Sequence, residues 1–371
     1  MIIKTVSLQP RTTTPASPVT IAVEFDSVFP WATLKNAHVN WQEIKAVYQN
    51  WRFGINETLW AGGTNMAIQQ VRAQVNGVWT TLTLDASSGK YVGTLAAPSV
   101  TSYNVNAGHY YPVKIEATNK AGTVTTVDEN NATVGNSLKL YVKETTKPTI
   151  TITAPTAGAF LATGVPAITF QLRDETSGSG IDISSLKLTV DSKEYASSAM
   201  TVTKVTNGYD VTFTPTTALT DGAHTIKVNV SDNDGNAATT VSRSFTTDTV
   251  PPSLSITAPS TNDIWVSNST YTVTGATNDS ISGIASVKIT LNGTDQGTIS
   301  VGSNGAFSKA VALKPGTNTI VVTATDKAGK TSSVTRTINL ETDAPVITAV
   351  AINPNPVNVN NSYTITVTLE G

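Results

Sequence analysis

The same strand-and-turn segment occurs twice without a gap, and this repeat limits the possible folds more than any other feature of the sequence. The first copy, GAHTIKVNVSDNDG, covers Gly222 to Gly235, and the second, GTNTIVVTATDKAG, covers Gly316 to Gly329. A looser third copy, YYPVKIEATNKAG, ends at Gly122. Apolar and polar residues alternate in all three copies, which is typical of strands that pack on one face only. The repeat predicts an all-β chain of tandem β-sandwiches.

The alternation also predicts which side chains of the two full copies are buried. The residues expected to face the core are Ile226, Val228, Val230, Ile320, Val322 and Ala324. Their neighbours are expected to face outward: Lys227, Asn229, Ser231, Val321, Thr323 and Thr325. We expect each repeat to form a seven-stranded or similar antiparallel sandwich.

Length and linkers divide the chain into units. A chain of 371 residues is too long for one ordinary core. The linkers Lys147-Pro148 and Val250-Pro251-Pro252 each precede a near-identical strand, TITITAP or SLSITAP. The predicted units are an N-terminal sandwich-like anchoring domain at residues 1–146, sandwiches at 147–248 and 249–342, and a partial domain or hairpin at 343–371.

The N-terminal unit contains a tryptophan-rich segment that differs from the rest of the chain. Trp31, Trp41 and Trp51 are evenly spaced, and apolar residues between them recur at helical intervals. The pattern predicts short helices inserted at about residues 28–60. These tryptophans either cover one end of the N-terminal core or form a docking surface for a partner.

The last segment repeats the opening of the chain. Ile365, Val367 and Leu369 match Ile21, Val23 and Phe25 in register when residues are counted from Pro354 and Pro10. Two strands alone bury too little surface to be stable. We therefore predict that the segment packs on the third domain, is completed by another polypeptide, or belongs to a longer chain. The favoured prediction is that Ile365, Val367 and Leu369 bind a partner.

Acidic residues near the turns suggest a weak calcium site. Asp232 and Asp234 alternate in the sequence DNDGN, and Asp174 or Glu175 could lie nearby. Calcium bound through Asp232, Asp234 and Asp248 would stabilise the joint between the second and third domains. Asp and Asn before glycine are also what a tight turn requires, so the favoured interpretation is a turn with no metal and no cofactor.

Composition and motifs argue against an enzyme. The sequence has no cysteine, a formal net charge of −2 and only 13% charged residues, which gives no indication of a thiolate site, nucleic acid binding or an anionic membrane partner. His38, His109 and His224 are scattered, without a second ligand at metal spacing. We expect His224 to occupy the strand position that Asn318 has in the next unit.

Two resemblances suggest what kind of protein this is. The segments PSLSITAP, GTNTIVVTATDKAG and DTVPP resemble bacterial immunoglobulin-like repeats. The opening TVSLQPRTTTPASPVTIAVEF, the WATLK and WQEIK motifs and the closing INPNPVNVNNSYTITVTLE resemble structural proteins of tailed phages from Gram-positive, clostridia-like hosts. The first resemblance implies an all-β fold of tandem immunoglobulin-like β-sandwiches. The second implies a non-enzymatic virion protein of the tail or baseplate.

The phage resemblance also implies partners and a location. A virion protein is assembled in the host cytoplasm, in several copies and with other virion proteins, and its outer domains could contact host cell-wall polysaccharide. The start MIIKTVSLQPRTTTP has no secretory signal pattern, which agrees with that location, although a chain trimmed of its signal would look the same. The alternatives are a bacterial surface adhesin or carbohydrate-binding array, located at the cell surface, and a capsid decoration fibre.

Overall fold

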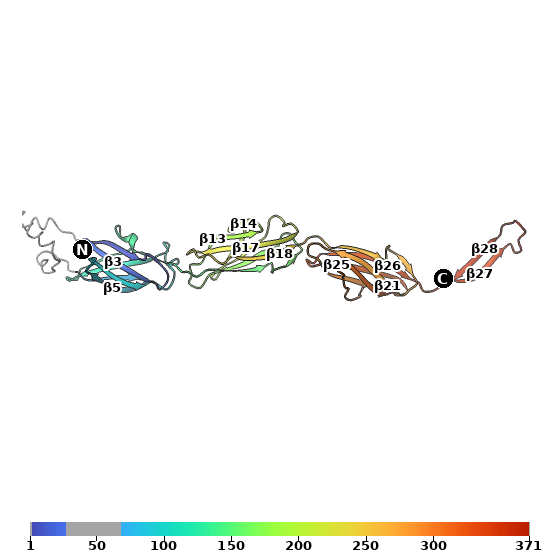
Figure 1. Ribbon diagram of the computed structural model, residues 1–371, viewed down its shortest axis with the longest axis horizontal. Helices are drawn as coiled ribbons and strands as arrows, with labels where there is room; N and C mark the ends of the chain where they lie inside the picture. The colour runs from blue at the N-terminus through green and yellow to red at the C-terminus, as the bar shows by residue number, and fades with distance from the viewer. Residues whose placement is uncertain (1, 27–67, 371) are drawn as a thin grey trace, which may run out of the picture.

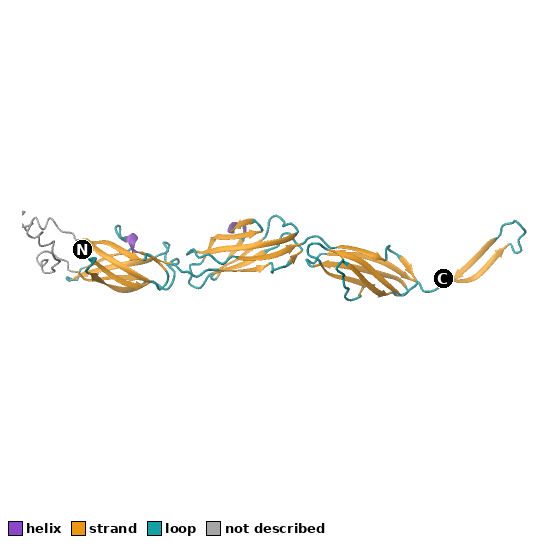
Figure 2. Cartoon of the chain, viewed as in Figure 1, coloured by secondary structure: helices purple, strands orange, loops and turns teal. Residues whose placement is uncertain are grey.

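The structure, a computed structural model, describes residues 2–26 and 68–370 of the chain. Three β-sandwiches follow one another in a row, and a separate hairpin projects beyond the third (Figure 1). The described residues are almost entirely strand and loop (Figure 2). Their only helical segments are the short 3-10 turns η2 at Gly135–Leu138 and η3 at Ser197–Ala199. The all-β expectation is confirmed.

The first sandwich is one continuous path of strands wrapped around a core. Its order is β1-β3-β6-β5-β4-β7-β9-β2, with β8 paired to β7. The core is built from the inward residues of these strands together with η2. The strands are β1 Ile2–Gln9, β2 Thr12–Thr13, β3 Pro18–Asp26, β4 Ile68–Val75, β5 Val78–Asp85, β6 Lys90–Ala96, β7 Tyr111–Asn119, β8 Val124–Val127 and β9 Lys139–Val142.

The second sandwich packs a four-stranded sheet on a five-stranded sheet. The orders are β10-β12-β16-β15 and β11-β18-β17-β13-β14. Its core includes Phe170, Leu188 and Phe245, all fully buried. The strands are β10 Thr149–Ala154, β11 Phe160–Leu161, β12 Ile168–Arg173, β13 Ile181–Val190, β14 Lys193–Ala196, β15 Thr201–Val205, β16 Gly208–Phe213, β17 Gly222–Asp232 and β18 Val241–Thr247.

The third sandwich repeats this plan with one strand fewer. Its sheets have the orders β19-β21-β24 and β20-β26-β25-β22-β23. The Asn292-Gly293 pair makes the turn from β22 to β23 with positive φ at both residues, as the sequence predicts. The strands are β19 Ser253–Ala258, β20 Ile264–Val266, β21 Thr270–Asn278, β22 Ile284–Leu291, β23 Thr294–Asp295, β24 Ala306–Ala312, β25 Gly316–Asp326 and β26 Thr331–Leu340.

A short strand near the start of each sandwich pairs parallel with the last strand, which corrects the expectation of antiparallel sandwiches. In the second sandwich, β10 pairs antiparallel with β12, and β11 then pairs parallel with β18 in the opposite sheet. The third sandwich does the same with β20 and β26. In the first, β2 pairs parallel with β9 at the other end of the strand path from β1. A short second half-strand can do this because it runs in the same direction as the last strand of its domain.

The predicted burial is confirmed in β17 and β25. All six residues expected to face the core are buried, and their alternate neighbours are exposed or half-buried. The register of the two strand copies is therefore the same, and the repeat in the sequence is a repeat in space.

The hairpin of β27 Val346–Asn353 and β28 Thr364–Glu370 reproduces the first hairpin of the chain. Its residues pair in the same register as those of β1 and β3, and both hairpins have a register shift after the second residue of the first strand. Ile352 pairs with Ile365 as Leu8 pairs with Ile21. The predicted duplication of the opening strands is thus confirmed for backbone pairing.

The predicted helical insertion at about residues 28–60, with Trp31, Trp41 and Trp51, lies outside the described residues, and nothing among those residues supports it.

Candidate functional site

The turn after β17 ties the first sandwich to the second through Asp234. Asp234 Oδ2 accepts hydrogen bonds from Thr101 Oγ1 and from the backbone N–H of Glu144, at 2.5 and 3.0 Å. The Lys143 ammonium donates to the backbone oxygen of the same aspartate at 3.2 Å. Hydrogen bonds to a charged carboxylate are stronger than those between neutral groups. Asp234 therefore acts as a docking residue between domains.

Glu144 lies in the linker after β9 and turns its side chain into the second sandwich. Its Oε1 accepts from the Ser179 backbone N–H and hydroxyl, at 2.9 and 3.0 Å. Its backbone oxygen accepts from the Asn236 amide at 3.1 Å. The linker is thus held by hydrogen bonds to both the side chain and the backbone of Glu144, from two loops at one end of the second sandwich.

Three carboxylates gather at this first junction with little to offset their charge. One oxygen of each of Glu144, Asp174 and Glu175 lies within 4.8 Å of the others. Asp174 Oδ1 and Glu175 Oε2 are buried and have no hydrogen-bond partner. Burial and contact with the Glu175 carboxyl raise the pKa of Glu144 to about 7, and the nearby Asp232 acts in the same direction. Burial also raises the pKa of Asp174.

The second junction has the same kind of cluster. One oxygen of each of Asp248, Asp279 and Asp326 lies within 4.8 Å of the others. Asp326 Oδ2 is buried without a partner. Burial would raise the pKa of Asp279, but backbone N–H groups, led by that of Gly283, donate to its carboxylate and lower the pKa overall. Asp279 therefore remains anionic.

The two clusters lie at equivalent junctions and share two of their three positions, Glu144 with Asp248 and Asp174 with Asp279. The linker carboxylates Glu144 and Asp248 accept from the N–H groups of Ser179 and Ser282. Each serine precedes a glycine whose own N–H donates to the loop aspartate, Asp174 or Asp279. The strand-final aspartates correspond too. Asp232 and Asp326 each accept from the residue four positions later, Asn236 or Lys330.

The predicted calcium set Asp232, Asp234 and Asp248 does not come together. Asp232 and Asp234 are at the end of β17, at the first junction, whereas Asp248 follows β18, at the second. Because β17 and β18 are antiparallel neighbours, their ends lie at opposite poles of the sandwich. Of the nearby acids, Asp174 lies close enough to Asp232 for their charges to interact, as the sequence suggests, and Glu175 lies beside Asp174.

Sequence reasoning missed Glu144, Asp279 and Asp326. The signal for two of them is in the repeat itself. Asp326 aligns with Asp232 at the end of the repeated strand, and Asp279 and Asp174 each follow the second long strand of their sandwich. Glu144 stands five residues before its next strand, as Asp248 does. Only the folded chain brings Glu144 beside Asp174 at the first junction and Asp279 beside Asp326 at the second.

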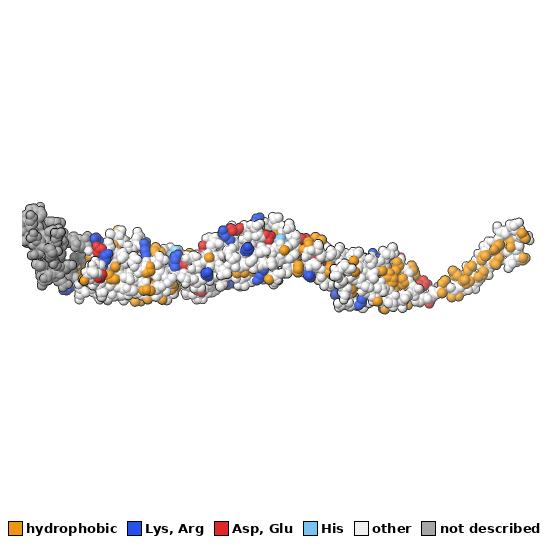
Figure 3. Space-filling model, viewed as in Figure 1, with side chains coloured by type: hydrophobic (Ala, Val, Ile, Leu, Met, Phe, Trp, Pro, Cys, Tyr) orange, Lys and Arg blue, Asp and Glu red, His pale blue; other side chains and the backbone are white. Residues whose placement is uncertain are grey.

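The terminal hairpin exposes an apolar face. Ile365, Val367 and Leu369 are 54%, 47% and 58% exposed, and they lie beside their cross-strand partners Ile352, Val350 and Ile347. Figure 3 shows apolar side chains along the hairpin. Long exposed apolar strands are templates for pairing with another polypeptide.

A second exposed residue lies at the end of the third sandwich, before the hairpin. Trp265 in β20 is 69% exposed and pairs with Asn339, one residue before the last of β26. Its counterpart in the second sandwich is Phe160, which pairs with Thr246. The Lys327 ammonium of the third sandwich lies 5.6 Å from the Phe160 ring centre. Trp265 thus stands at the position through which one sandwich contacts the next.

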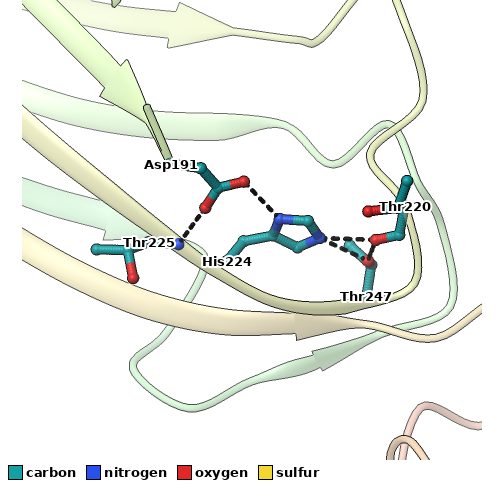
Figure 4. Close-up of polar contacts among 5 residues, drawn as sticks. All are labelled: Asp191, Thr220, His224, Thr225 and Thr247. Atoms are coloured by element: carbon teal, nitrogen blue, oxygen red, sulfur yellow. Dashed lines mark hydrogen bonds and ion pairs between the residues drawn. The ribbon is translucent and has the colours of Figure 1, made fainter. Parts of the chain in front are cut away.

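His224 lies in a buried polar cluster of the second sandwich (Figure 4). Its Nδ1 is 2.9 Å from Asp191 Oδ2, and its Nε2 is 2.8 Å from the Thr220 backbone oxygen and 3.0 Å from Thr247 Oγ1. Thr247 is fully buried, and its hydroxyl donates to the Thr220 backbone oxygen, so this hydroxyl is not accessible as a nucleophile. The cluster closes the turn before β17.

Asn318 does in the third sandwich what His224 does in the second. Its amide donates to the backbone oxygens of Lys314 and Gly316, and its Oδ1 accepts from the Asn292 amide. Asn292 in turn accepts from the Thr319 N–H, as Asp191 does from Thr225. The predicted correspondence of His224 and Asn318 is therefore confirmed, and the role is structural.

A shallow hollow of about 160 Å³ lies beside the first junction. It is smaller than typical small-molecule sites, which occupy roughly 300–1,000 Å³. Its lining residues are Ser102, Tyr103, His109, Tyr141, Lys143, Asn233 and Asp234. Within residues 2–26 and 68–370, no helix has the length and hydropathy needed to cross a membrane.

Comparison with known proteins identifies the modules. The family model described as a bacterial Ig-like domain matches residues 145–249, and that of domain B of glucodextranase matches residues 252–342. No curated protein matches the sequence. The chain therefore carries tandem Ig-like β-sandwiches.

Solved structures match this chain at low similarity. The fibronectin(III)-like modules of Clostridium thermocellum CbhA are 16% identical, with a TM-score of 0.34 over 52% of this chain and 94% of theirs. A tetra-tandem repeat from the extending region of a large adhesion protein is 16% identical, with a TM-score of 0.35 over 98% of this chain and 87% of its own. A 1.5-MDa bacterial ice-binding adhesin is 19% identical, with a TM-score of 0.30 over 91% and 97%.

Proposed function

We propose that this chain is a non-enzymatic structural and adhesive component of a phage or phage tail-like particle, associated with the tail or baseplate. Its N-terminal domain anchors it to other virion proteins, in several copies. Its Ig-like domains project toward the host surface, where cell-wall polysaccharide is the candidate ligand.

The shape of the chain supports a spacer or projecting role. The three sandwiches are arranged end to end, with the two ends of the described chain far apart (Figure 1). At the two junctions, the carboxylates of Asp234, Glu144 and Asp248 accept hydrogen bonds from backbone N–H groups across the joint. Linkers held in this way keep consecutive domains in a fixed direction better than free coil does.

The exposed hairpin is the observation that carries the proposal. Its strands pair in the same register as β1 and β3, whose apolar side chains lie in the core of a complete sandwich. Among the described residues no strand covers the corresponding face of β27 and β28, where Val350 and Val367 are exposed. We infer that this hairpin packs against a neighbouring subunit or completes a sandwich with another virion protein.

The end of the third sandwich supports the same inference. Trp265 is exposed at the position where Phe160 contacts the next domain, and Glu341 stands five residues before β27, as Asp248 stands before β19. Trp265 and Glu341 thus occupy the positions that Phe160 and Asp248 have at the second junction, so a further domain could be joined there in the same way. Exposed tryptophan is also enriched at interaction hot spots.

Two readings of the array remain as candidates. The resemblance of the opening and closing segments to tailed-phage structural proteins supports the virion role. The matches to a bacterial Ig-like domain and to domain B of glucodextranase favour the second candidate, a bacterial surface adhesin or carbohydrate-binding array. A capsid decoration fibre is a variant of the first.

The decisive experiment is to locate the chain. Particles purified from the host are probed with an antibody to this protein by electron microscopy, and their proteins are identified by mass spectrometry. Labelling at the tail or baseplate is the expected result, and labelling of the head identifies a decoration fibre. If the chain is absent from particles and found on the bacterial surface, the adhesin is the correct function.

A further inference from the structure

The two junction clusters, Glu144/Asp174/Glu175 and Asp248/Asp279/Asp326, share a feature that hydrogen bonding does not explain. Asp174 is only 8% exposed and Asp326 only 1%, yet one carboxylate oxygen of each has no partner. An unpaired buried carboxylate oxygen costs considerable free energy unless a proton or a cation neutralises it. The unpaired oxygens belong to the same triads whose oxygens converge within 4.8 Å.

Positively charged side chains do not supply the missing charge. Within the described part of the chain, no ion pair joins a lysine, arginine or histidine to any of the six carboxylates. Lys143 donates to a backbone oxygen, and Lys327 lies over the Phe160 ring. Each cluster therefore carries a local excess of negative charge at a site shielded from water.

A single shared proton can bridge only two of the three converging oxygens in either cluster. At the first junction, Asp174 and Glu175 each keep a buried oxygen without a hydrogen-bond partner beside Glu144. At the second junction, backbone N–H groups already donate to the Asp279 carboxylate, and Asp326 still keeps an unpaired buried oxygen. A divalent ion can contact all three oxygens at once.

The ligand chemistry points to one class of ion. The triads offer only carboxylate oxygens, without imidazole or thiolate, and such hard oxygen sets favour calcium or magnesium over zinc and copper. Calcium accepts irregular arrangements of six to eight oxygens, whereas magnesium demands near-octahedral geometry. The carboxylates come from a linker and a loop, joined at the second junction by a strand end, and such an irregular set suits calcium better.

We propose that each domain junction binds one calcium ion, the first through Glu144, Asp174 and Glu175 and the second through Asp248, Asp279 and Asp326. Each ion joins a linker carboxylate to acids of the following sandwich. Calcium binding therefore fixes the direction in which one domain follows another. This inference does not depend on the proposed function, because it concerns the chain wherever it is located.

The test is calorimetric titration of the full chain with calcium chloride after removal of divalent ions by a chelator. We expect two calcium ions per chain. Asp174→Asn should remove or weaken at least tenfold the first site only, and Asp326→Asn the second only. Asp295→Asn, on the exposed β22–β23 hairpin, is the matched control and should retain both sites. Magnesium should bind more weakly at both.

Further measurements distinguish loss of a calcium ligand from loss of folding in the variants. Circular dichroism checks each protein, and Glu175→Gln and Asp279→Asn provide independent changes at the two sites. Small-angle scattering of the wild-type chain should show a longer, stiffer particle with calcium than with chelator. A chain that takes up no calcium overturns the proposal, and a site that survives both of its own substitutions is not the site proposed.

Discussion

Val6 and Val350 occupy the same position in two copies of one hairpin, but only Val6 is buried. Val6 pairs with Val23 and Val350 with Val367, in the same register. Val6 is 5% exposed, whereas Val350 is 58% exposed. The difference lies in what covers them, since strands β4 to β9 complete the sandwich around Val6 and the described chain supplies no equivalent for Val350.

Removing everything after Glu341 should leave the three sandwiches folded but weaken assembly. The hairpin contributes none of the residues of their three cores. Thermal unfolding of the truncated chain should match that of the full chain. Co-purification with particles, or self-association measured by analytical ultracentrifugation, should decrease.

A milder change tests the same apolar face. Val350→Ser with Val367→Ser places two hydroxyls on it and should have the effect of truncation, whereas Thr366→Ser, paired with Ala351 at the alternate position, should have none. Normal assembly of both the truncated and the double-serine chain would show that the hairpin is not a binding element.

Replacing Val228 or Val322 by alanine should destabilise its own sandwich by about 1–3 kcal/mol, through lost burial and the cavity that remains. Both valines are fully buried at equivalent positions of β17 and β25. Chemical denaturation followed by intrinsic fluorescence measures the change. Thr323→Ala, at a half-buried outward position, should cost less. An equal cost for all three substitutions would contradict the assigned core.

Asp234→Ala should loosen the first junction without unfolding the second sandwich. The substitution removes the acceptor for Thr101 and for the Glu144 N–H, while the turn itself is held by Asp232. Small-angle scattering should show a broader range of particle lengths, with the melting temperature of the second sandwich nearly unchanged. A large fall in that melting temperature would show that Asp234 supports the domain core instead.

In buffer without divalent ions, the stability of the first junction should fall as pH rises. The pKa of Glu144 is raised from 4.5 to about 7 in the folded chain by burial, by the Glu175 carboxyl and by Asp232, and the pKa of Asp174 is raised as well. The folded chain therefore binds more protons than the unfolded chain between these values. The stability that the folded chain gains from this extra proton is complete below about pH 4.5 and is lost as pH approaches 7.

Glu144→Gln provides the control for this pH dependence. The amide keeps the oxygen that accepts from Ser179 but cannot ionise. Thermal unfolding of the variant should vary less between about pH 5 and 8 than that of the wild-type chain. An identical pH profile for the two proteins would assign the dependence to other groups.

The repeat in the sequence predicts most of the fold but little of the junctions. Period-two alternation places Ile226 and Ile320 in their cores because one face of each strand is buried against the opposite sheet. The same local reasoning cannot place Asp248 relative to Asp232, since that depends on which pole of the sandwich each strand end reaches. The unpaired oxygens of Asp174 and Asp326 arise only when a linker, a loop and a strand end meet.

The parallel pairing of β11 with β18 gives the array a mechanical property. Phe160 and Leu161 pair beside Thr246 and Thr247, at the end where the chain leaves the second sandwich. A pull along the chain draws the first and last strands of the domain in opposite directions. Their hydrogen bonds run across that pull, so they are loaded together and do not open one after another. Since β2 with β9 and β20 with β26 repeat the arrangement, every sandwich in the row is built to bear tension along its length.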